Sequence, residues 1–180
     1  MTTNYDPIAE QYKRSKLQPW RTYIECFTLM KLIGDPHGLS VLDVACGEGF
    51  YTRMVRERGA ARVTGIDLSQ GMIELARKQE AQQRLGIEYL VGDARELTGD
   101  RQFDLVIAAY LLNYARDPQE LHVMYGALAR CLRPGGRFVT VSMPARRWCS
   151  RTHGHIASTG SRRACGDRGS KGCRSSGPST

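Results

Sequence analysis

The stretch Val41-Leu42-Asp43-Val44-Ala45-Cys46-Gly47-Glu48-Gly49-Phe50 decides the fold of this chain. Its first four residues form a short, mostly apolar run typical of a buried strand, and the small residues after them predict a tight turn. Helical spacing of apolar residues resumes at Phe50 and stops at Gly59, a residue type that commonly follows the last turn of a helix. A strand, a small-residue loop and a helix therefore follow one another directly.

The same alternation of strands and helices continues along the chain. Further strands are predicted over residues 62–66, 87–91, 103–108 and 137–142. Helices are predicted over residues 8–13, 19–34, 50–58 and 69–84, and from Asp117-Pro118 onwards. Strands that are apolar throughout and separated by helices indicate a parallel sheet covered on both faces. The predicted fold class is therefore α/β, a Rossmann-like, doubly wound and mainly parallel sheet with N-terminal helices, whose ligand lies beyond the carboxyl ends of the strands.

The helix that starts at Pro19 is predicted to end near Gly34. Its apolar residues recur with helical spacing, so we expect them to form one face turned toward the core. That face consists of Trp20, Tyr23, Ile24, Phe27, Met30 and Ile33.

Composition and charge divide the chain of 180 residues into a nearly neutral body and a basic tail. The whole chain has a net charge of +8. Residues 145–180 carry eight basic residues and one acidic residue, whereas residues 1–144 carry 18 basic and 17 acidic residues. The tail has no apolar periodicity, so we expect it to be disordered. The longest apolar run is far below the ~20 residues that cross a bilayer. With no secretory signal at the start, a cytoplasmic protein with free cysteines is predicted.

The loop after the first strand suits close contact with a ligand. Ala45, Gly47 and Gly49 let the backbone approach it and aim amide groups at it, although any tight turn between a strand and a helix favours such residues. Asp67 ends the next strand, 18 residues beyond Gly49. This spacing is close to the ~20 residues expected for a carboxylate that binds two ribose hydroxyls. The alternative is that Asp67 merely ends a strand before a helix cap at Ser69.

Asp43 bears on which nucleoside cofactor the loop binds. It lies two residues before the first small residue of the loop. A carboxylate there would repel a pyrophosphate, but it would attract a cofactor that carries an ammonium group and a sulfonium. Asp43 also has a structural alternative, capping of the loop amides, and the two roles are compatible.

Five motifs extend this pattern beyond the loop. They are Asp43-Val44-Ala45-Cys46-Gly47-Glu48-Gly49, Asp67-Leu68-Ser69, Gly92-Asp93-Ala94, Phe103-Asp104-Leu105-Val106 and Arg133-Pro134-Gly135-Gly136. Over about residues 5–142, their order and spacing resemble those of class I S-adenosylmethionine-dependent methyltransferases. The particular residues in these motifs most resemble those of bacterial small-molecule methyltransferases of the toxoflavin-synthesis type.

The resemblance implies S-adenosylmethionine as the cofactor and a set of residues that bind it. Ala45 to Gly49 would hold the methionine part and the ribose, and Asp67 the ribose hydroxyls. Leu68 and Met72 would flank the adenine. The full set is Tyr12, Asp43, Ala45, Cys46, Gly47, Gly49, Asp67, Leu68, Met72, Asp93, Ala94 and Ala109.

The remaining positions of this set lie on other loops and on the first helix. The resemblance implies that Asp93 accepts from the adenine amino group beside the Ala94 amide, and that Ala109 lies near the reacting methyl. Tyr12 lies on the short N-terminal helix, which closes over the cofactor in such relatives; simple packing is its alternative. The expected division is a helical lid over residues 1–39, an S-adenosylmethionine-binding domain over residues 40–144 and the tail over residues 145–180.

No catalytic residue is named by the sequence. Methyl transfer from a sulfonium is an in-line displacement, so the protein mainly aligns the acceptor and excludes water, and a base is optional. Tyr110, Asn113 and Tyr114 are the polar residues after the fourth strand, and we expect structural roles for them. His122 is expected on the surface. No metal site is predicted, because the tail cysteines and histidines match no paired CxxC arrangement.

The predicted function is methyl transfer from S-adenosylmethionine to a small molecule, with no membrane or nucleic-acid partner. Two alternatives stay open: an RNA-directed methyltransferase that uses the basic tail, and a cofactor-binding product without catalysis. We also expect that the reading frame changes after about Met143, because apolar periodicity stops there. The last strands of the family fold would then be missing, leaving a marginally stable core and impaired catalysis.

Overall fold

Five strands form a single parallel sheet in the computed structural model, which describes residues 19, 21–99 and 101–142. The strands are β1 (Ser40–Val44), β2 (Arg62–Asp67), β3 (Glu88–Val91), β4 (Phe103–Ala109) and β5 (Leu132–Val141). The helices are the π-helix η2 (Arg21–Glu25), α2 (Cys26–Ile33), α3 (Phe50–Glu57), α4 (Gln70–Gln83), the 3₁₀ turn η3 (Leu112–Tyr114) and α5 (Pro118–Cys131). The predicted helix over residues 8–13, Trp20 and the tail over residues 145–180 lie outside the described residues.

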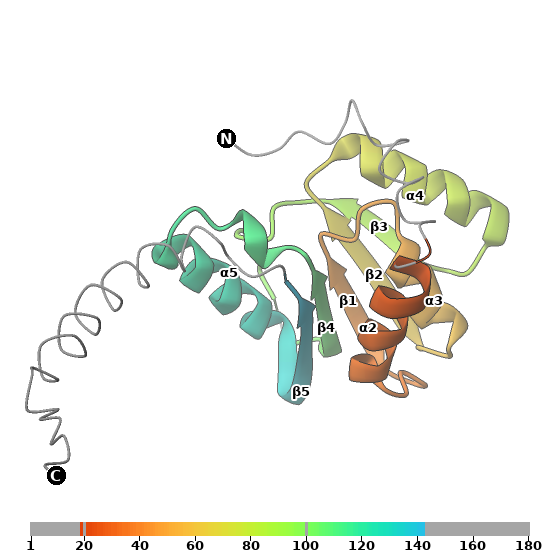
Figure 1. Cartoon of the computed structure of the whole chain (residues 1–180), viewed down its shortest axis with the longest axis horizontal. Helices are drawn as coiled ribbons and strands as arrows, with labels where there is room; N and C mark the ends of the chain where they lie inside the picture. The colour runs from red at the N-terminus through yellow and green to blue at the C-terminus, as the bar shows by residue number, and fades with distance from the viewer. Residues whose placement is uncertain (1–18, 20, 100, 143–180) are drawn as a thin grey trace, which may run out of the picture. The chain divides into compact units, whose positions relative to one another are not determined.

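The strand order β3-β2-β1-β4-β5 places β1 in the middle of the sheet (Figure 1). In register, Asp43 of β1 lies opposite Gly65 of β2 on one side and Ile107 of β4 on the other. The chain moves outward in one direction through β2 and β3 and then returns to the other side of β1. This reversal creates a switch point between the carboxyl ends of β1 and β4, where ligands of such sheets bind. The predicted α/β, doubly wound fold is confirmed.

Alternate residues of the central strands enter two separate cores. Val41 packs with α2, α3 and α4 on one face of the sheet. Leu42 packs with α5 on the other face. Because successive side chains of a strand point to opposite faces, Asp43 lies on the same face as Val41, toward α3. Figure 1 shows α5 separated by the sheet from the other labelled helices.

Helix termini follow the capping residues that the sequence predicts. Ser69 caps α4 and accepts a hydrogen bond from the Met72 amide, at 3.2 Å. Asp117 caps α5 and accepts from the Glu120 amide, at 2.7 Å, with Pro118 in the first turn. Such caps stabilise a helix by about 1 kcal/mol each, because they satisfy amides that lack a partner within the helix. His122, on α5, is exposed as predicted.

The predicted core face of the helix after Pro19 is wrong in its first half. Tyr23, Ile24 and Phe27 are exposed by 75%, 67% and 66%. Instead, Cys26 and Leu29 are buried together with Met30 and Ile33. Residues 21–25 form a π-helix, whose wider turn shifts the register of the residues after it. Spacing that assumes one regular α-helix therefore selects the wrong face before Met30.

Strand β5 begins at Leu132, five residues before the predicted start at Arg137. The residues between them include Pro134-Gly135-Gly136, which were expected to form a turn outside the strand. The pairing with β4 jumps from Phe103–Leu132 to Leu105–Arg137, so the extra residues form an irregularity within the strand pair. Such bulges accommodate turn-forming residues without ending a strand.

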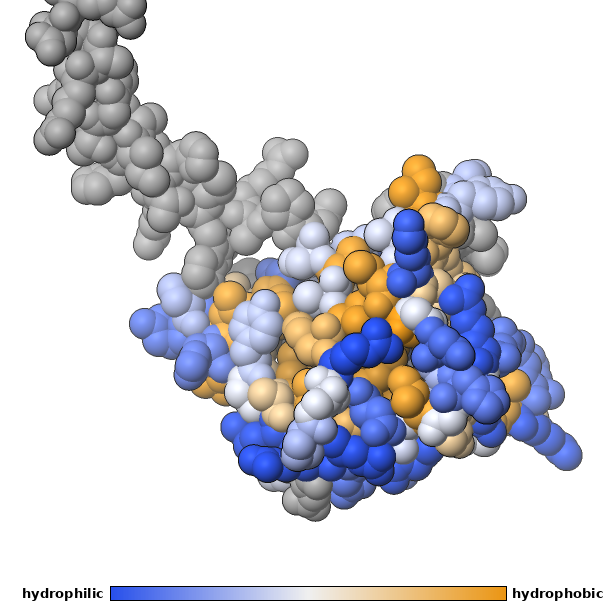
Figure 2. All heavy atoms as spheres, turned by 90° about the horizontal axis from the view of Figure 1, so that it is seen from below, coloured by the Kyte–Doolittle hydropathy of each residue, from blue (hydrophilic) through white to orange (hydrophobic). Residues whose placement is uncertain are grey.

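The surface of the described residues mixes charged and apolar side chains. Figure 2 shows hydrophobic areas between hydrophilic ones on one face of the molecule. Large apolar residues that reach the surface include Leu68, Val123 and Tyr125. Within the described ranges, none of the helices has the length and apolar character needed to cross a membrane.

Candidate functional site

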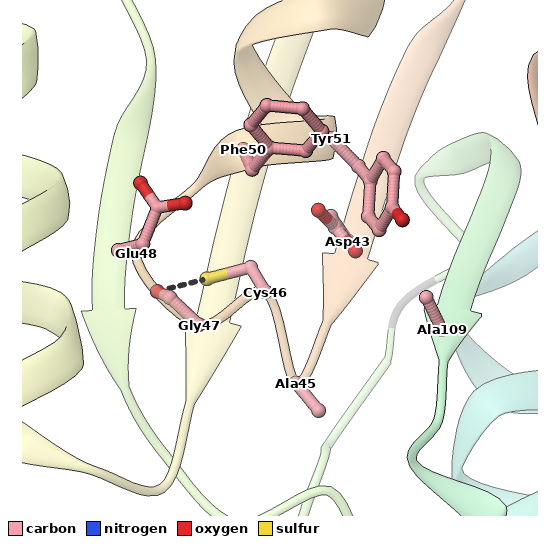
Figure 3. Close-up of a pocket in the computed structure, with 8 residues that line it drawn as sticks. All are labelled: Asp43, Ala45, Cys46, Gly47, Glu48, Phe50, Tyr51 and Ala109. Carbon is pink, nitrogen blue, oxygen red and sulfur yellow. Dashed lines mark hydrogen bonds between the residues drawn. The ribbon is translucent and has the colours of Figure 1, made fainter. Parts of the chain in front are cut away.

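A small pocket, open to solvent, lies at the switch point between β1 and β4. Five of its lining residues belong to the set that the sequence predicts, namely Asp43, Ala45, Cys46, Gly47 and Ala109. Figure 3 shows these residues together with the other three, Glu48, Phe50 and Tyr51.

The loop from β1 to α3 turns through three left-handed backbone positions. Ala45, Gly47 and Gly49 have φ angles of 59°, 59° and 82°. The Cys46 amide donates to the carbonyl of Ile66 at 3.1 Å, which fixes the loop against β2. A Cβ at Gly49 would lie 2.8 Å from Cζ of the buried Tyr89 ring, so the position needs glycine for space as well as for conformation. The loop is therefore closely packed on the sheet beneath it.

Asp67 connects this loop to the next strand and helix. It ends β2, and its Oδ2 accepts a hydrogen bond from the Gly47 amide at 2.7 Å. Its Oδ1 accepts from the Ser69 amide at 2.9 Å. The carboxylate therefore fixes the loop after β1 to the start of α4 through two backbone amides.

Asp43 lies behind the loop and is 1% exposed. Its Oδ2 accepts a hydrogen bond from the Thr52 hydroxyl of α3, at 2.6 Å. This contact ties the end of β1 to the first turns of α3. The buried carboxylate also faces the pocket, which it lines.

Carboxylates dominate the electrostatics of the pocket. Burial raises the pKa of the Cys46 thiol well above its ordinary value, and the neighbouring charges of Asp43 and Asp67 raise that pKa further. Cys46 therefore remains an uncharged thiol at neutral pH. Glu48, also buried, is paired with Arg53 at 2.7 Å. The charges nearest the loop thus favour a cationic ligand, because like charges would be repelled at short distance.

Asp93, which follows β3, lies away from the loop and holds an arginine. Its Oδ1 and Oδ2 accept from Arg95 Nε at 2.9 and 3.0 Å. This hydrogen bonding lowers the pKa of Asp93. Arg95 also donates to Glu120 of α5 at 2.9 Å, so the loop after β3 is tied to that helix.

Six described residues of the predicted set are not among those that line the pocket: Gly49, Asp67, Leu68, Met72, Asp93 and Ala94. Leu68 is 55% exposed, whereas Met72 is 2% exposed within α4. Asp93 and Ala94 lie on the loop after β3, and Ala94 packs in the core on the side of α5. Tyr12 is outside the described residues.

Tyr110, for which the sequence predicted a structural role, forms a cluster beside the pocket with two residues that the sequence did not single out, Glu25 and Tyr51. The carboxylate of Glu25 accepts hydrogen bonds from the Tyr51 and Tyr110 hydroxyls. Tyr51 directly follows the predicted loop, which is a signal that could have identified it. Glu25 has no such signal, because its position depends on the π-helix.

The described residues contain no group of three or more His, Cys, Asp or Glu side chains arranged to hold a metal ion. The cysteines and histidines of the tail are outside this range.

Residues 41–136, slightly more than half of the chain, match the family model described as "Methyltransferase domain". The ubiquinone biosynthesis O-methyltransferase of Coxiella burnetii is 39% identical over 101 residues, which cover 56% of this chain and 42% of that protein. The demethylmenaquinone methyltransferase of Lactococcus lactis is 35% identical over 145 residues, covering 78% of this chain and 54% of that protein. The chain thus spans about half the length of the curated relatives it matches.

A solved structure agrees with these sequence relatives. The S-adenosylmethionine dependent methyltransferase from Mesorhizobium loti has a TM-score of 0.56 and 33% identity to this chain. The similarity covers 64% of this chain and 51% of that one.

Proposed function

Because this chain belongs to the family of methyltransferase domains, we propose that it transfers a methyl group from S-adenosylmethionine to a small molecule. S-adenosylmethionine is the methyl donor of class I methyltransferases. The named relatives from Coxiella burnetii and Lactococcus lactis act in ubiquinone biosynthesis and on demethylmenaquinone, which supports a small-molecule acceptor. We further propose a similarity to toxoflavin-synthesis enzymes, which rests only on the residues of the sequence motifs.

One contact carries the proposal most directly, the hydrogen bond from the Gly47 amide to Asp67 Oδ2 at 2.7 Å. It joins the small-residue loop after β1 to the carboxylate that ends β2, at the switch point where ligands of doubly wound sheets bind. A ribose placed on Asp67 would have the rest of the cofactor along this loop. The glycine positions leave no side chain in its way.

The proposed roles follow from position. Ala45, Cys46, Gly47 and Gly49 line the methionine part and ribose, and the negative charge of Asp43 favours the ammonium and sulfonium groups. The proposal further assigns Leu68 and Met72 to the adenine faces, Asp93 and Ala94 to the adenine edge, Ala109 to the neighbourhood of the methyl, and Tyr12 to the cover.

The chemistry requires little of the protein beyond placement. When bound, the cofactor supplies an electrophilic methyl on a positively charged sulfur. The loop and Asp67 orient this group, and the aromatic residues Phe50 and Tyr51 shield the pocket from water. Alignment of two reactants can lower the barrier of such a transfer by about 7–11 kcal/mol. The proposal also assigns residues 1–39 as a helical lid over the S-adenosylmethionine-binding domain, residues 40–144.

Calorimetric titration of the whole chain with S-adenosylmethionine tests the cofactor site. We expect saturable binding that Asp67→Asn weakens by about 10-fold or more, because a charged hydrogen-bond acceptor contributes ~1.5–3 kcal/mol. Asp35→Asn is the matched control, since Asp35 is exposed and lies outside the pocket. Absence of binding by the unaltered chain, or equal affinities for both variants, contradicts the proposal. Binding without product on any acceptor would instead indicate a non-catalytic cofactor-binding protein.

A further inference from the structure

Glu25, Tyr51 and Tyr110 form a buried polar cluster beside the cofactor pocket. Glu25 ends η2 and is 6% exposed. One of its carboxylate oxygens accepts from the Tyr51 hydroxyl, and the other, Oε2, accepts from the Tyr110 hydroxyl at 2.6 Å. Burial of a carboxylate is costly unless donors compensate it, and the two phenols supply such donors.

The cluster lies on the side of the pocket formed by the end of β4. Tyr51 and Ala109 both line the pocket, and Tyr110 is the next residue after Ala109. Figure 3 shows the Tyr51 ring between Asp43 and Ala109. Burial, followed by the hydrogen bond to Glu25, raises the pKa of Tyr51, so this residue stays a neutral donor.

Tyr110 is held in an unfavourable backbone conformation. Its φ angle is 64°, in the left-handed region that bulky residues rarely adopt. Such a conformation costs on the order of 1–2 kcal/mol and persists only where surrounding contacts impose it. The Tyr110 amide donates to the Val141 carbonyl at 2.7 Å, and its hydroxyl binds Glu25. The fold thus places this phenol beside Ala109 at an energetic cost.

The other carboxylates around the pocket already have functions within the loop. Asp43 binds Thr52, Glu48 binds Arg53, and Asp67 binds the Gly47 and Ser69 amides. Glu25 instead binds Tyr110, the residue that follows Ala109. Through Tyr110 it is placed to receive a proton from an acceptor bound near the methyl.

We propose that Tyr110 and Glu25 form a proton relay for a phenolic methyl acceptor. This inference rests on the proposed function, which places the reacting methyl near Ala109. The acceptor hydroxyl donates to the Tyr110 oxygen while Tyr110 donates to Glu25 Oε2. As the acceptor oxygen forms its bond to the methyl, the methyl–sulfur bond breaks and its electron pair stays on sulfur. The acceptor proton passes to Tyr110, and the Tyr110 proton passes to Glu25.

The relay balances charge as well as atoms. A sulfonium cation and the Glu25 carboxylate become a neutral thioether and a neutral carboxylic acid, and Tyr110 is regenerated. A phenol, with a pKa near 10, is far easier to deprotonate in this way than an alkyl alcohol. The aromatic residues Phe50 and Tyr51 in the lining also suit a flat ring.

Two methyl acceptors can distinguish a role of Glu25 in removing the acceptor proton from a role in positioning alone. Catechol must lose a proton during transfer, whereas 4-nitrophenol is already largely ionised at mildly alkaline pH. We expect the unaltered chain to methylate both. Glu25→Gln keeps the size of the side chain and its capacity to bind the tyrosines, but it cannot take up the proton. It should lower the rate on catechol by about 100-fold or more, as loss of general-base catalysis does, and the rate on 4-nitrophenol by less than about 10-fold.

Tyr110→Phe should show the same difference between the two acceptors. Glu57→Gln, an exposed change on α3, is the matched control and should leave both rates unchanged. Equal losses on both acceptors would assign Glu25 a purely structural role and overturn the relay. Retained catechol methylation in Glu25→Gln would overturn it too, as would methylation of neither phenol by unaltered protein that binds S-adenosylmethionine. Failure of that protein to bind S-adenosylmethionine would instead refute the proposed function.

Discussion

At the scale of single residues, the pocket depends on positions where a side chain cannot be added. Gly49 combines a left-handed backbone with contact to Tyr89, whose ring is 4% exposed. The same ring lies 2.8 Å from where a Cβ on Gly65 would be, so it cannot move away from one glycine without approaching the other. Two glycines and one tyrosine therefore keep the loop close to the sheet.

Gly49→Ala should destabilise the fold more than Gly38→Ala does. Both positions have a left-handed backbone, with φ of 82° and 73°, but a Cβ at Gly38 meets nothing within 4 Å. Gly38→Ala should cost only the conformational strain of about 1–2 kcal/mol. Gly49→Ala should cost about 1–3 kcal/mol more, because of overpacking against Tyr89. Urea unfolding measures both values, and equal costs would show that Tyr89 does not constrain the loop.

At the scale of elements, side chains connect segments that are not neighbours in the sheet order. Arg95 links the loop after β3 to α5 through Asp93 and Glu120. Arg116 binds the same Glu120 from the residues just before α5, at 2.9 Å. Hydrogen bonds from Arg116 are the main reason that the pKa of Glu120 falls to about 2. Two arginines thus meet at Glu120 in the first turn of α5, and Arg95 also binds Asp93.

Arg95→Met should raise the pKa of Asp93, whereas Arg116→Met should leave it unchanged. The hydrogen bond from Arg95 is the main cause of the lowered pKa. A lowered pKa in the folded state means that this group stabilises the fold above the pKa of the unfolded chain, near 3.8, and loses that effect at lower pH. Carboxyl NMR titration measures the shift. Below about pH 4, the free energy of unfolding of Arg95→Met should also fall less steeply than that of the unaltered protein. Identical Asp93 titrations in Arg95→Met and Arg116→Met would contradict the assignment of the lowered pKa to Arg95.

At the scale of the whole molecule, stability rests on the central strands and the two cores they separate. Leu105 of β4 is fully buried, between β1 and β5 in the sheet order. Leu90 belongs to the edge strand β3 and is 40% exposed. The same residue type therefore occupies very different environments within one sheet.

Leu105→Ala should lower the free energy of unfolding by about 2–5 kcal/mol, because it removes apolar contacts and leaves a cavity. Leu90→Ala deletes the same atoms at an exposed site and should cost less than about 1 kcal/mol. Chemical unfolding of both variants provides the comparison. Similar costs would mean that the centre of the sheet does not determine stability.

Much of the fold could be predicted because its signals are local in the chain. The strands around Val41 and Val106, the caps at Ser69 and Asp117, and the loop at Gly47 are read from patterns of a few residues. The errors occurred where local rules were interrupted. The π-helix at residues 21–25 changed the buried face, and the bulge before Arg137 lengthened β5. Neither irregularity has a sequence pattern as specific as a cap or a glycine turn.

The sequence by itself determined the alternation of strands and helices, the loop after β1, and the carboxylates Asp43 and Asp67, because their spacing along the chain corresponds to fixed positions on a parallel sheet. Only the tertiary structure decided which side chains meet across the fold. Glu25 and Tyr110 are 85 residues apart and form a hydrogen bond. The π-helix sets the direction of the Glu25 side chain, and the left-handed backbone sets that of Tyr110. Such contacts depend on how helices and strands pack, and packing is a property of the whole chain rather than of any short stretch.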